Sequence, residues 1–270
     1  MDLFSRSASD IVKRGFAIVQ TPKHVYDLFA VIESSHKYLS EADKRDYSFE
    51  ARADGFLPQG QEYAENSPEK PDLCERFCYW HRYNQDHRKH SLFNTAFHSA
   101  VRQYEREISD FGQRVLDAVV SNFGQPRILG GRMDSYVQLC IYESKHRRPG
   151  RDFLQEPHVD GHLLTFITNT SQGLAIQGDA GMDAIYLERD EMLIMAGTLM
   201  EEVTDGLVRG ALHAVLPNPH CDSRRSLIYF MNPPRTVGST RSFSQGRLLD
   251  MAQIANSKHV GFGNPPLHQF

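Results

Sequence analysis

The chain has 270 residues, of which 40% are hydrophobic and 24% charged, and these values are typical of a globular protein with a large core. Its net charge of −4 argues against binding to nucleic acid or to an anionic membrane surface. No stretch approaches the roughly 18 apolar residues of a membrane span, and the charged N-terminal segment is unlike a secretory signal. Four cysteines form no disulfide framework, so we expect reduced thiols in a cytoplasmic protein, either a monomer or a homodimer.

The first 125 residues have a mainly helical pattern. Residues 10–20 predict a helix that ends near Gly15 and is followed by a short strand. Ser40, with Asp43 three residues later, predicts a helix that begins with a capping box. Apolar residues three or four apart predict two amphipathic helices, and glycines and prolines predict a loop between them. The two helices are expected at residues 22–37 and 91–122, and the loop at residues 54–71.

From residue 132 onward, short β-rich runs alternate with turn residues. Several short strands at regular spacing favour a sandwich or jelly roll over a parallel sheet with helical crossovers. The final segment should hold a helix near residues 246–257, either across the barrel mouth or on a contact surface. The predicted strands are residues 132–142, 163–168, 174–177, 184–187, 192–195, 211–216 and 226–231.

His158-Val159-Asp160 is the centre of the chemical interpretation. Pro157 precedes this run and an apolar, β-rich stretch follows it, so the segment should be extended. Side chains on a strand alternate between faces, which places His158 and Asp160 on the same face. An imidazole and a carboxylate in this arrangement supply two thirds of the facial triad of non-haem Fe(II) oxygenases. The hypothesis requires a third ligand, which we expect to be a distant histidine on an adjacent strand.

Two later strands supply candidates for the rest of the site. His213 lies on a predicted strand about fifty residues after Asp160, and Arg224-x-Ser226 follows on the next predicted strand. Arg224 and Ser226 share one face, and a guanidinium beside a hydroxyl suits a carboxylate ligand. The phenol of Tyr142 could complete this anion site. The combined pattern of His-x-Asp, His and Arg-x-Ser is far more specific than any of its parts.

The same segments resemble the isopenicillin N synthase-like family of Fe(II)/2-oxoglutarate-dependent oxygenases. HVDGHLLTFITNTSQGLAIQ, AGTLMEEVTDGLVRGALHAV and RRSLIYFMNPP are similar to that family's metal-binding and cosubstrate-binding segments, and the N-terminal half resembles its helical region. The fold implied is mainly β with flanking helices (α+β): a double-stranded β-helix, or cupin-like jelly roll, with a helical N-terminal portion. We therefore divide the chain into an N-terminal region (1–125), an oxygenase core (126–240) and a C-terminal helix and tail (241–270).

The resemblance implies a role for each matching residue. His158, Asp160 and His213 would bind Fe(II), whereas Arg224, Ser226 and Tyr142 would hold 2-oxoglutarate. The chain departs from the family pattern at Cys140, where an asparagine is common, and at Thr198, where an aspartate is common. Neither departure removes a metal ligand. Related halogenases have Gly or Ala in place of the metal-binding aspartate, so Asp160 argues against halogenation.

The activity implied is oxidation of a small molecule by O2, with 2-oxoglutarate converted to succinate and CO2. Hydroxylation is the default outcome, and desaturation or cyclisation are the variants. One alternative is an isopenicillin N synthase-type Fe(II) oxidase that does not use 2-oxoglutarate. Another is a jelly-roll metal-binding or regulatory protein without catalysis. Release of succinate would separate the first two, and oxygen consumption with Fe(II) would exclude the third.

The substrate is not defined by these motifs, but strand alternation and the motif spacing suggest which side chains face it. The candidate substrate contacts are Gln138, Cys140, His162 and Phe230. The loop between residues 143 and 156 is basic, and it is either a solvated charged loop or a site for an acidic substrate group; its basic residues are Lys145, His146, Arg147, Arg148 and Arg151. We expect no chemical role for eight further histidines, which are His81, His87, His90, His98, His146, His220, His259 and His268.

Overall fold

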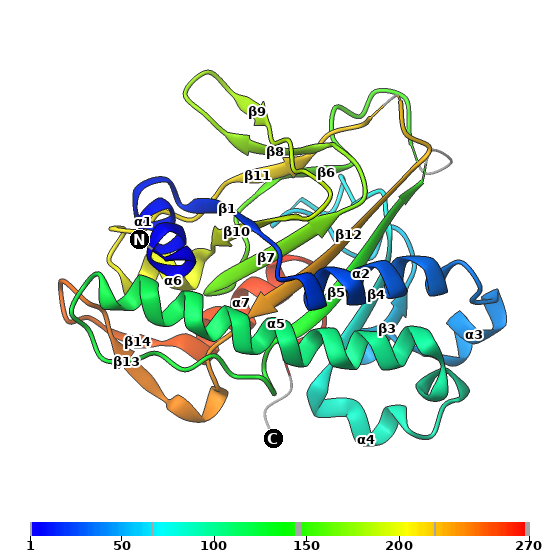
Figure 1. The fold of residues 1–270 in the computed structure, drawn as a ribbon, viewed down its shortest axis with the longest axis horizontal. Helices are drawn as coiled ribbons and strands as arrows, with labels where there is room; N and C mark the ends of the chain where they lie inside the picture. The colour runs from blue at the N-terminus through cyan, green and yellow to red at the C-terminus, as the bar shows by residue number, and fades with distance from the viewer. Residues whose placement is uncertain (1, 66, 144–146, 219, 268–270) are drawn as a thin grey trace.

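The computed structural model describes residues 2–65, 67–143, 147–218 and 220–267. Two antiparallel sheets face each other, and helices pack on the outer face of the larger one (Figure 1). The helices are α1 (Leu3–Arg14), α2 (Lys23–His36), α3 (Glu41–Asp46), α4 (Asn84–His87), α5 (Ala96–Ser121), α6 (Thr198–Val203) and α7 (Met251–Gly261), with short 3-10 helices at Glu50–Arg52, His81–Tyr83, Ser91–Asn94 and Arg235–Val237.

The larger sheet has the strand order β1-β10-β7-β12-β5-β4-β3-β2. The smaller sheet has the order β6-β11-β8-β9, and β13 and β14 form a separate hairpin. In sequence order the strands are β1 (Phe16–Gln20), β2 (Ser48–Phe49), β3 (Asp54–Leu57), β4 (Glu75–Trp80), β5 (Tyr136–Glu143), β6 (Gln155–His158), β7 (Leu164–Asn169), β8 (Leu174–Gln177), β9 (Met182–Ala184), β10 (Glu191–Ala196), β11 (His213–Val215), β12 (Ser223–Met231), β13 (Ser239–Arg241) and β14 (Leu248–Asp250).

The larger sheet is buried on both faces, and each face belongs to a different core. Val137, Leu139 and Ile141 of β5 pack with α1, α2 and α5 in the main hydrophobic core. The alternate residues Cys140 and Tyr142 point the other way, into the space between the two sheets. Because the side chains of β5 alternate in this way, one strand supports both the helical layer and the interior of the β-sandwich.

The expected fold class is confirmed: N-terminal helices cover antiparallel sheets of the double-stranded β-helix type. The capping box is also present, since Ser40 and Asp43 cap α3 reciprocally. The N-terminal region contributes more than helices, because β1 to β4 complete the larger sheet. Among the described residues no helix is both long and apolar enough to cross a membrane. All four cysteines are free thiols.

Several predicted boundaries were wrong for identifiable reasons. The expected loop at residues 54–71 begins with strand β3, where Gly55 pairs with Cys78 of β4, a partner that local pattern does not reveal. The long helix predicted from residue 91 is interrupted, because Thr95 caps α5 and leaves Ser91–Asn94 as a 3-10 turn. The C-terminal helix starts at Met251, where the Asp250 side chain accepts a hydrogen bond from the Gln253 backbone. The strand expected at residues 184–187 lies instead at Met182–Ala184.

Candidate metal centre

A cavity lies between the two sheets and is lined by both of them. The larger sheet contributes side chains from β5, β7 and β12, and the smaller sheet contributes β6, β8 and β11. The loop that holds Glu62 and the C-terminal segment that holds α7 form further parts of the wall. All ten candidate site residues from the sequence line this single cavity: His158, Asp160, His213, Arg224, Ser226, Tyr142, Gln138, Cys140, His162 and Phe230.

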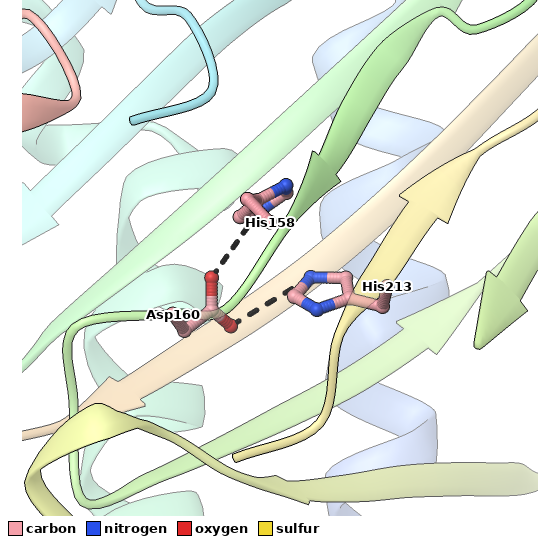
Figure 2. A group of neighbouring side chains, drawn as sticks. All are labelled: His158, Asp160 and His213. Carbon is pink, nitrogen blue, oxygen red and sulfur yellow. Dashed lines mark ion pairs between the residues drawn. The ribbon is translucent and has the colours of Figure 1, made fainter. Parts of the chain in front are cut away.

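The three proposed metal ligands converge in this cavity (Figure 2). His158 ends β6 and His213 begins β11, and the two residues are direct partners in the antiparallel ladder. Asp160 follows β6 by two residues, so it is positioned by the turn after the strand rather than by the strand itself. Asp160 Oδ1 lies 3.4 Å from His158 Nε2, and Asp160 Oδ2 lies 3.8 Å from His213 Nε2. One ligand atom from each residue lies within 4.8 Å of the others.

Hydrogen bonds to the backbone fix the orientation of both imidazoles. His158 Nδ1 donates to the carbonyl of Glu156 at 2.8 Å, and His213 Nδ1 donates to the carbonyl of Ala211 at 3.0 Å. A carbonyl can only accept, so in each neutral ring the proton is on Nδ1 and the lone pair is on Nε2. Both Nε2 atoms therefore face Asp160 as potential metal donors, the orientation that backbone partners commonly impose on metal-binding histidines.

Burial and mutual proximity set the charge state of the cluster. Burial lowers the pKa of His213 to about 4, so this imidazole is neutral near pH 7. Burial alone would raise the pKa of Asp160, but the adjacent His213 and His158 outweigh it and hold that pKa well below its usual range. Thr165 Oγ1 also donates to Asp160 Oδ2 at 2.7 Å. Burial would lower the pKa of His158, but its interaction with Asp160 outweighs burial and raises that pKa. The apo cluster thus combines a neutral imidazole at His213 with an ionised carboxylate, and metal binding would displace any proton from His158 Nε2.

Arg224 and Ser226, which we call the carboxylate clamp, lie on neighbouring cavity-facing positions of β12. Arg224 Nη1 donates to Ser226 Oγ, and Arg224 Nε donates to the carbonyl of Ser171 at 3.3 Å. Nη2 is buried and has no hydrogen-bond partner among the described residues. Arg225 points to the opposite face, where its guanidinium lies 3.6 Å from Glu33 of α2. The cavity therefore holds a buried cation with an unused donor, which suits an anionic ligand.

Tyr142 lies across the ladder from Arg224, and the Arg224 guanidinium is 5.4 Å from its ring centroid. Its hydroxyl does not contact the clamp directly. Instead it donates to Gln155 Oε1 at 3.2 Å, and Gln155 Nε2 donates to Asp72 Oδ2 at 2.9 Å. Asp72 in turn pairs with the buried Arg76. Tyr142 therefore links the clamp to a polar network that sequence analysis did not predict.

Residues from segments far from the motifs also form part of the site, and no sequence pattern indicated them. Glu62 and Asn264 face the cavity, and Phe262 packs its ring against His158 with centroids 5.4 Å apart. His259, for which no role was expected, lines the same cavity on α7. His146 and His268 lie outside the described residues. The burial of Glu62 in a polar loop has no local sequence signal, since its partners come from three other segments.

The described arginines of the basic loop do not line this cavity. Arg147 donates to the backbone carbonyls of Asn218 and Cys221, and Arg151 lies 3.2 Å from Glu156. Neither residue, nor Arg148, lines the cavity. Lys145 and His146 lie outside the described residues. These contacts favour a structural or solvated role for Arg147 and Arg151 over the binding of an acidic substrate group.

Comparisons with known proteins agree with this geometry. Residues 135–233 match the model of the 2OG-Fe(II) oxygenase superfamily. The chain is 28% identical to kihadalactone A synthase LFS of Citrus sinensis, over 43% of this chain and 39% of that protein. It is 27% identical to gibberellin 2-beta-dioxygenase 2 of Arabidopsis thaliana, over 51% of this chain and 43% of that protein. The matches thus span less than half the length of either relative.

Structural similarity extends over most of the chain. A full-length Neurospora crassa protein, whose crystal structure was determined in complex with alpha-KG, superposes with a TM-score of 0.74. The match covers 93% of this chain and 88% of that chain at 16% sequence identity. At this level of identity, the comparison establishes the shared fold.

Proposed function

Because this chain belongs to the 2OG-Fe(II) oxygenase superfamily, we propose that it is a non-haem Fe(II)- and 2-oxoglutarate-dependent oxygenase. It would use O2 to oxidise a small-molecule substrate, most simply by hydroxylation, while 2-oxoglutarate is converted to succinate and CO2. The observation that carries this proposal is the placement of the His158, Asp160 and His213 cluster in one cavity with the carboxylate clamp.

The donor set fits a divalent iron ion. Two imidazole nitrogens and one carboxylate leave further coordination positions free, and this set with open positions is characteristic of non-haem Fe(II) oxygenases. The backbone bonds of the Nδ1 atoms leave both Nε2 lone pairs free, and the two Nε2 atoms lie 3.4 and 3.8 Å from the Asp160 carboxylate. His158, Asp160 and His213 would therefore hold the ion from one side and leave its other side open to the cavity.

The carboxylate clamp fits the distal carboxylate of 2-oxoglutarate. Arg224 is nearly inaccessible to solvent and has an unused Nη2 donor, and Ser226 adds a hydroxyl two residues away on the same face. An unpaired guanidinium in such a site is costly, and a bidentate carboxylate would remove that cost. Tyr142 would position the clamp through ring packing against Arg224 rather than by a direct hydrogen bond.

The protein residues would have three tasks in the reaction. Bound Fe(II) would supply the one-electron and O2 chemistry that no side chain here can perform. Thr165 and the two backbone carbonyls hold the ligand side chains in place, and the clamp orients the cosubstrate. Phe262, packed against His158, covers the centre and limits the access of water to it.

Anaerobic titration tests this proposal. The Fe(II) protein is mixed with increasing 2-oxoglutarate under argon, and the visible charge-transfer band is recorded. We expect a saturable band whose formation requires both components. Its absence, with the protein folded and Fe(II) bound, would refute use of 2-oxoglutarate at this site.

Turnover then separates the remaining alternatives. Formation of succinate in proportion to O2 consumed is expected for the proposed activity. Oxygen consumption without succinate would instead indicate the Fe(II) oxidase alternative, and no consumption with any substrate would favour a metal-binding protein without catalysis.

A further inference from the structure

Two amide side chains in the cavity are held in a fixed orientation by one buried carboxylate. The carboxylate belongs to Glu62, which is only 9% exposed. We call Glu62 and the two amide residues that it contacts, Gln138 and Asn264, the amide cluster. Asn264 Nδ2 donates to Glu62 Oε1 at 2.6 Å, and Gln138 Nε2 donates to Glu62 Oε2 at 3.2 Å. An ionised carboxylate can only accept hydrogen bonds, so both amides must turn their NH2 groups toward Glu62.

This orientation leaves the amide carbonyl oxygens as acceptors for a ligand. Gln138 and Asn264 both line the cavity. Asn264 is 5% exposed, and within the described part of the chain no group donates to its Oδ1 atom. A buried acceptor without a partner destabilises a protein, and a ligand N–H or O–H group would relieve this cost.

The charges near the amide cluster do not favour an anion. Arg76 is the nearby cation, and its Nε lies 2.6 Å from Glu62 Oε2. The same guanidinium also pairs with Asp72 through Nη2, so two carboxylates share one positive charge. Arg76 is fully buried and does not line the cavity. A substrate carboxylate placed here would therefore meet Glu62 without a compensating cation, and like charges in a buried site repel strongly.

Aromatic rings shape the adjoining wall. The Tyr136 and Phe230 ring centroids are 4.7 Å apart, and those of His162 and Phe230 are 4.4 Å apart. Such faces favour a flat apolar ligand body. Phe262, two residues before Asn264, contacts the His158 ring. The amide cluster and the candidate metal centre thus line the same cavity, so one small molecule could contact both.

We propose that Gln138 and Asn264, oriented by Glu62, select a planar substrate that donates hydrogen bonds through N–H groups, and that they reject carboxylates. The inference deepens the proposed function by assigning a substrate class to the same cavity, and it rests on that function for the oxidation itself. It also opposes the alternative in which the basic loop binds an acidic substrate group.

Three fragments of matched shape test the proposal. Benzamidine presents only donors, benzamide presents a donor and an acceptor, and benzoate presents only acceptors. Their affinities are measured by isothermal titration calorimetry on the full chain loaded with Mn(II) and saturating 2-oxoglutarate, so that no turnover occurs. We expect benzamidine and benzamide to bind at least about tenfold more tightly than benzoate, which is the ratio that one hydrogen bond supplies. Equal or tighter binding of benzoate would overturn the proposal.

Two variants assign the preference to the amide cluster. Asn264→Leu removes the unpaired acceptor and should weaken benzamidine and benzamide roughly tenfold while leaving benzoate unchanged. Glu62→Gln should reduce the difference in affinity between benzamidine and benzoate. An amide at this position can donate a hydrogen bond, so the Gln138 and Asn264 amides could rotate and present their NH2 groups to the ligand. Glu62→Gln also provides an independent test if Asn264→Leu does not fold.

Asn256→Leu is the matched control. Asn256 lies on α7 and accepts a hydrogen bond from the Leu267 backbone at 2.7 Å, but it does not line the cavity. This variant should preserve the fragment order, by which we mean tighter binding of benzamidine and benzamide than of benzoate. If Asn256→Leu changed the fragment affinities as much as Asn264→Leu does, the C-terminal segment would act only through its packing. That result would refute the role of the amide cluster.

A further variant separates this proposal from the proposed function. Arg224→Leu removes the carboxylate clamp, so neither 2-oxoglutarate nor benzoate can bind there. If the fragment order persists in that variant without metal or cosubstrate, the amide cluster is selective on its own. Failure of 2-oxoglutarate to bind the native chain would then refute the oxygenase assignment alone, whereas loss of the fragment order with intact 2-oxoglutarate binding would refute this inference alone.

Discussion

His158 and His213 come from two strands that pair directly, whereas another part of the same cavity wall comes from a loop and the C-terminal segment. On the strand side, backbone hydrogen bonds fix the spacing of the ligands and the orientation of their rings. On the other side, Asn264 and Glu62 are separated by 202 residues and meet through a single side-chain hydrogen bond. The Lys258–Glu65 ion pair, at 2.7 Å, gives that wall a further attachment.

This difference indicates which parts of the site can vary independently. The strand side depends on the sheet, so it can be changed only at the side chains that project from it. The loop-and-tail wall depends on a few side-chain contacts and on one backbone hydrogen bond, which Tyr63 N donates to the Phe262 carbonyl at 3.3 Å. Its shape and polarity can therefore change without disturbing the sheet. We therefore expect substitutions on the two sides to affect different measurements: metal and cosubstrate binding on one, substrate selection and local stability on the other.

The largest effect should follow loss of the carboxylate ligand. Asp160→Ala removes the only anionic member of the cluster, and we expect metal affinity to fall by more than the 10- to 100-fold that loss of an outer partner typically costs. Succinate formation should fall below detection. Affinity is measured anaerobically by calorimetry with Fe(II) or Mn(II). Full activity of the variant would contradict the assignment. Val159→Ala, one residue away, is the control and should retain native affinity.

The clamp offers a comparison between adjacent arginines. Arg224→Ala should raise the KM for 2-oxoglutarate by roughly 30- to 5000-fold, since loss of one partner of a buried charged pair costs about 2–5 kcal/mol. Arg225→Ala should leave that KM nearly unchanged, because its side chain lies on the other face of β12 near Glu33. Both constants come from initial rates of succinate formation. The reverse ranking would show that the wrong arginine was assigned to the cosubstrate.

The two sides also differ in how far sequence could predict them. His158, Asp160, His213 and Arg224 could be identified because His-x-Asp, His and Arg-x-Ser occur at a characteristic spacing. Strand alternation correctly placed Arg224 and Ser226 on one face of β12, whereas Asp160 is placed by the turn after β6. Asn264 could not, because its role depends on where the segment after α7 is placed by tertiary contacts. The same distinction applies to the fold. The amphipathic helices and central strands could be predicted from local patterns, but β4 and its pairing with β3 depend on partners distant in sequence.

A third prediction perturbs the wall without touching the strands. Gly263 has φ of +84°, and a Cβ at this position would lie 2.6 Å from Tyr63 Cε1 and 2.9 Å from the carbonyl oxygen of Gln61. Gly263→Ala should therefore displace the C-terminal segment and reduce stability by about 1–3 kcal/mol through backbone strain and overpacking. Metal affinity should be retained, whereas benzamide binding should weaken. Thermal and urea unfolding give the stability change.

Gly124→Ala is the control for backbone strain alone. Gly124 also has a positive φ, +61°, but a Cβ there would meet no atom within 4 Å. This variant should show a smaller loss of stability and native benzamide binding. If both variants behave alike, the close contact with Tyr63 contributes nothing, and the wall would be less dependent on this packing than we infer.

The smallest effect concerns the pH dependence of the same wall. Burial lowers the pKa of His259 to about 3, and His162 and Arg235 act in the same direction. The docked tail therefore favours neutral His259, whereas an undocked tail binds a proton below the ordinary pKa of about 6.5. Docking should be strongest above that pH and should weaken as the pH falls below it, by about 1 kcal/mol at pH 5.5 for this single group.

Hydrogen exchange of α7 at pH 7.5 and 5.5, corrected for intrinsic exchange rates, measures this effect. Acid should increase opening of α7 in the native chain, and His259→Leu should reduce that increase. His36→Leu provides the control, because burial also lowers the pKa of His36 to about 4 but this residue lies on α2, behind the larger sheet. It should alter global acid stability without changing the local response of α7. An unchanged response in His259→Leu would show that acid acts on the whole fold rather than on the docked tail.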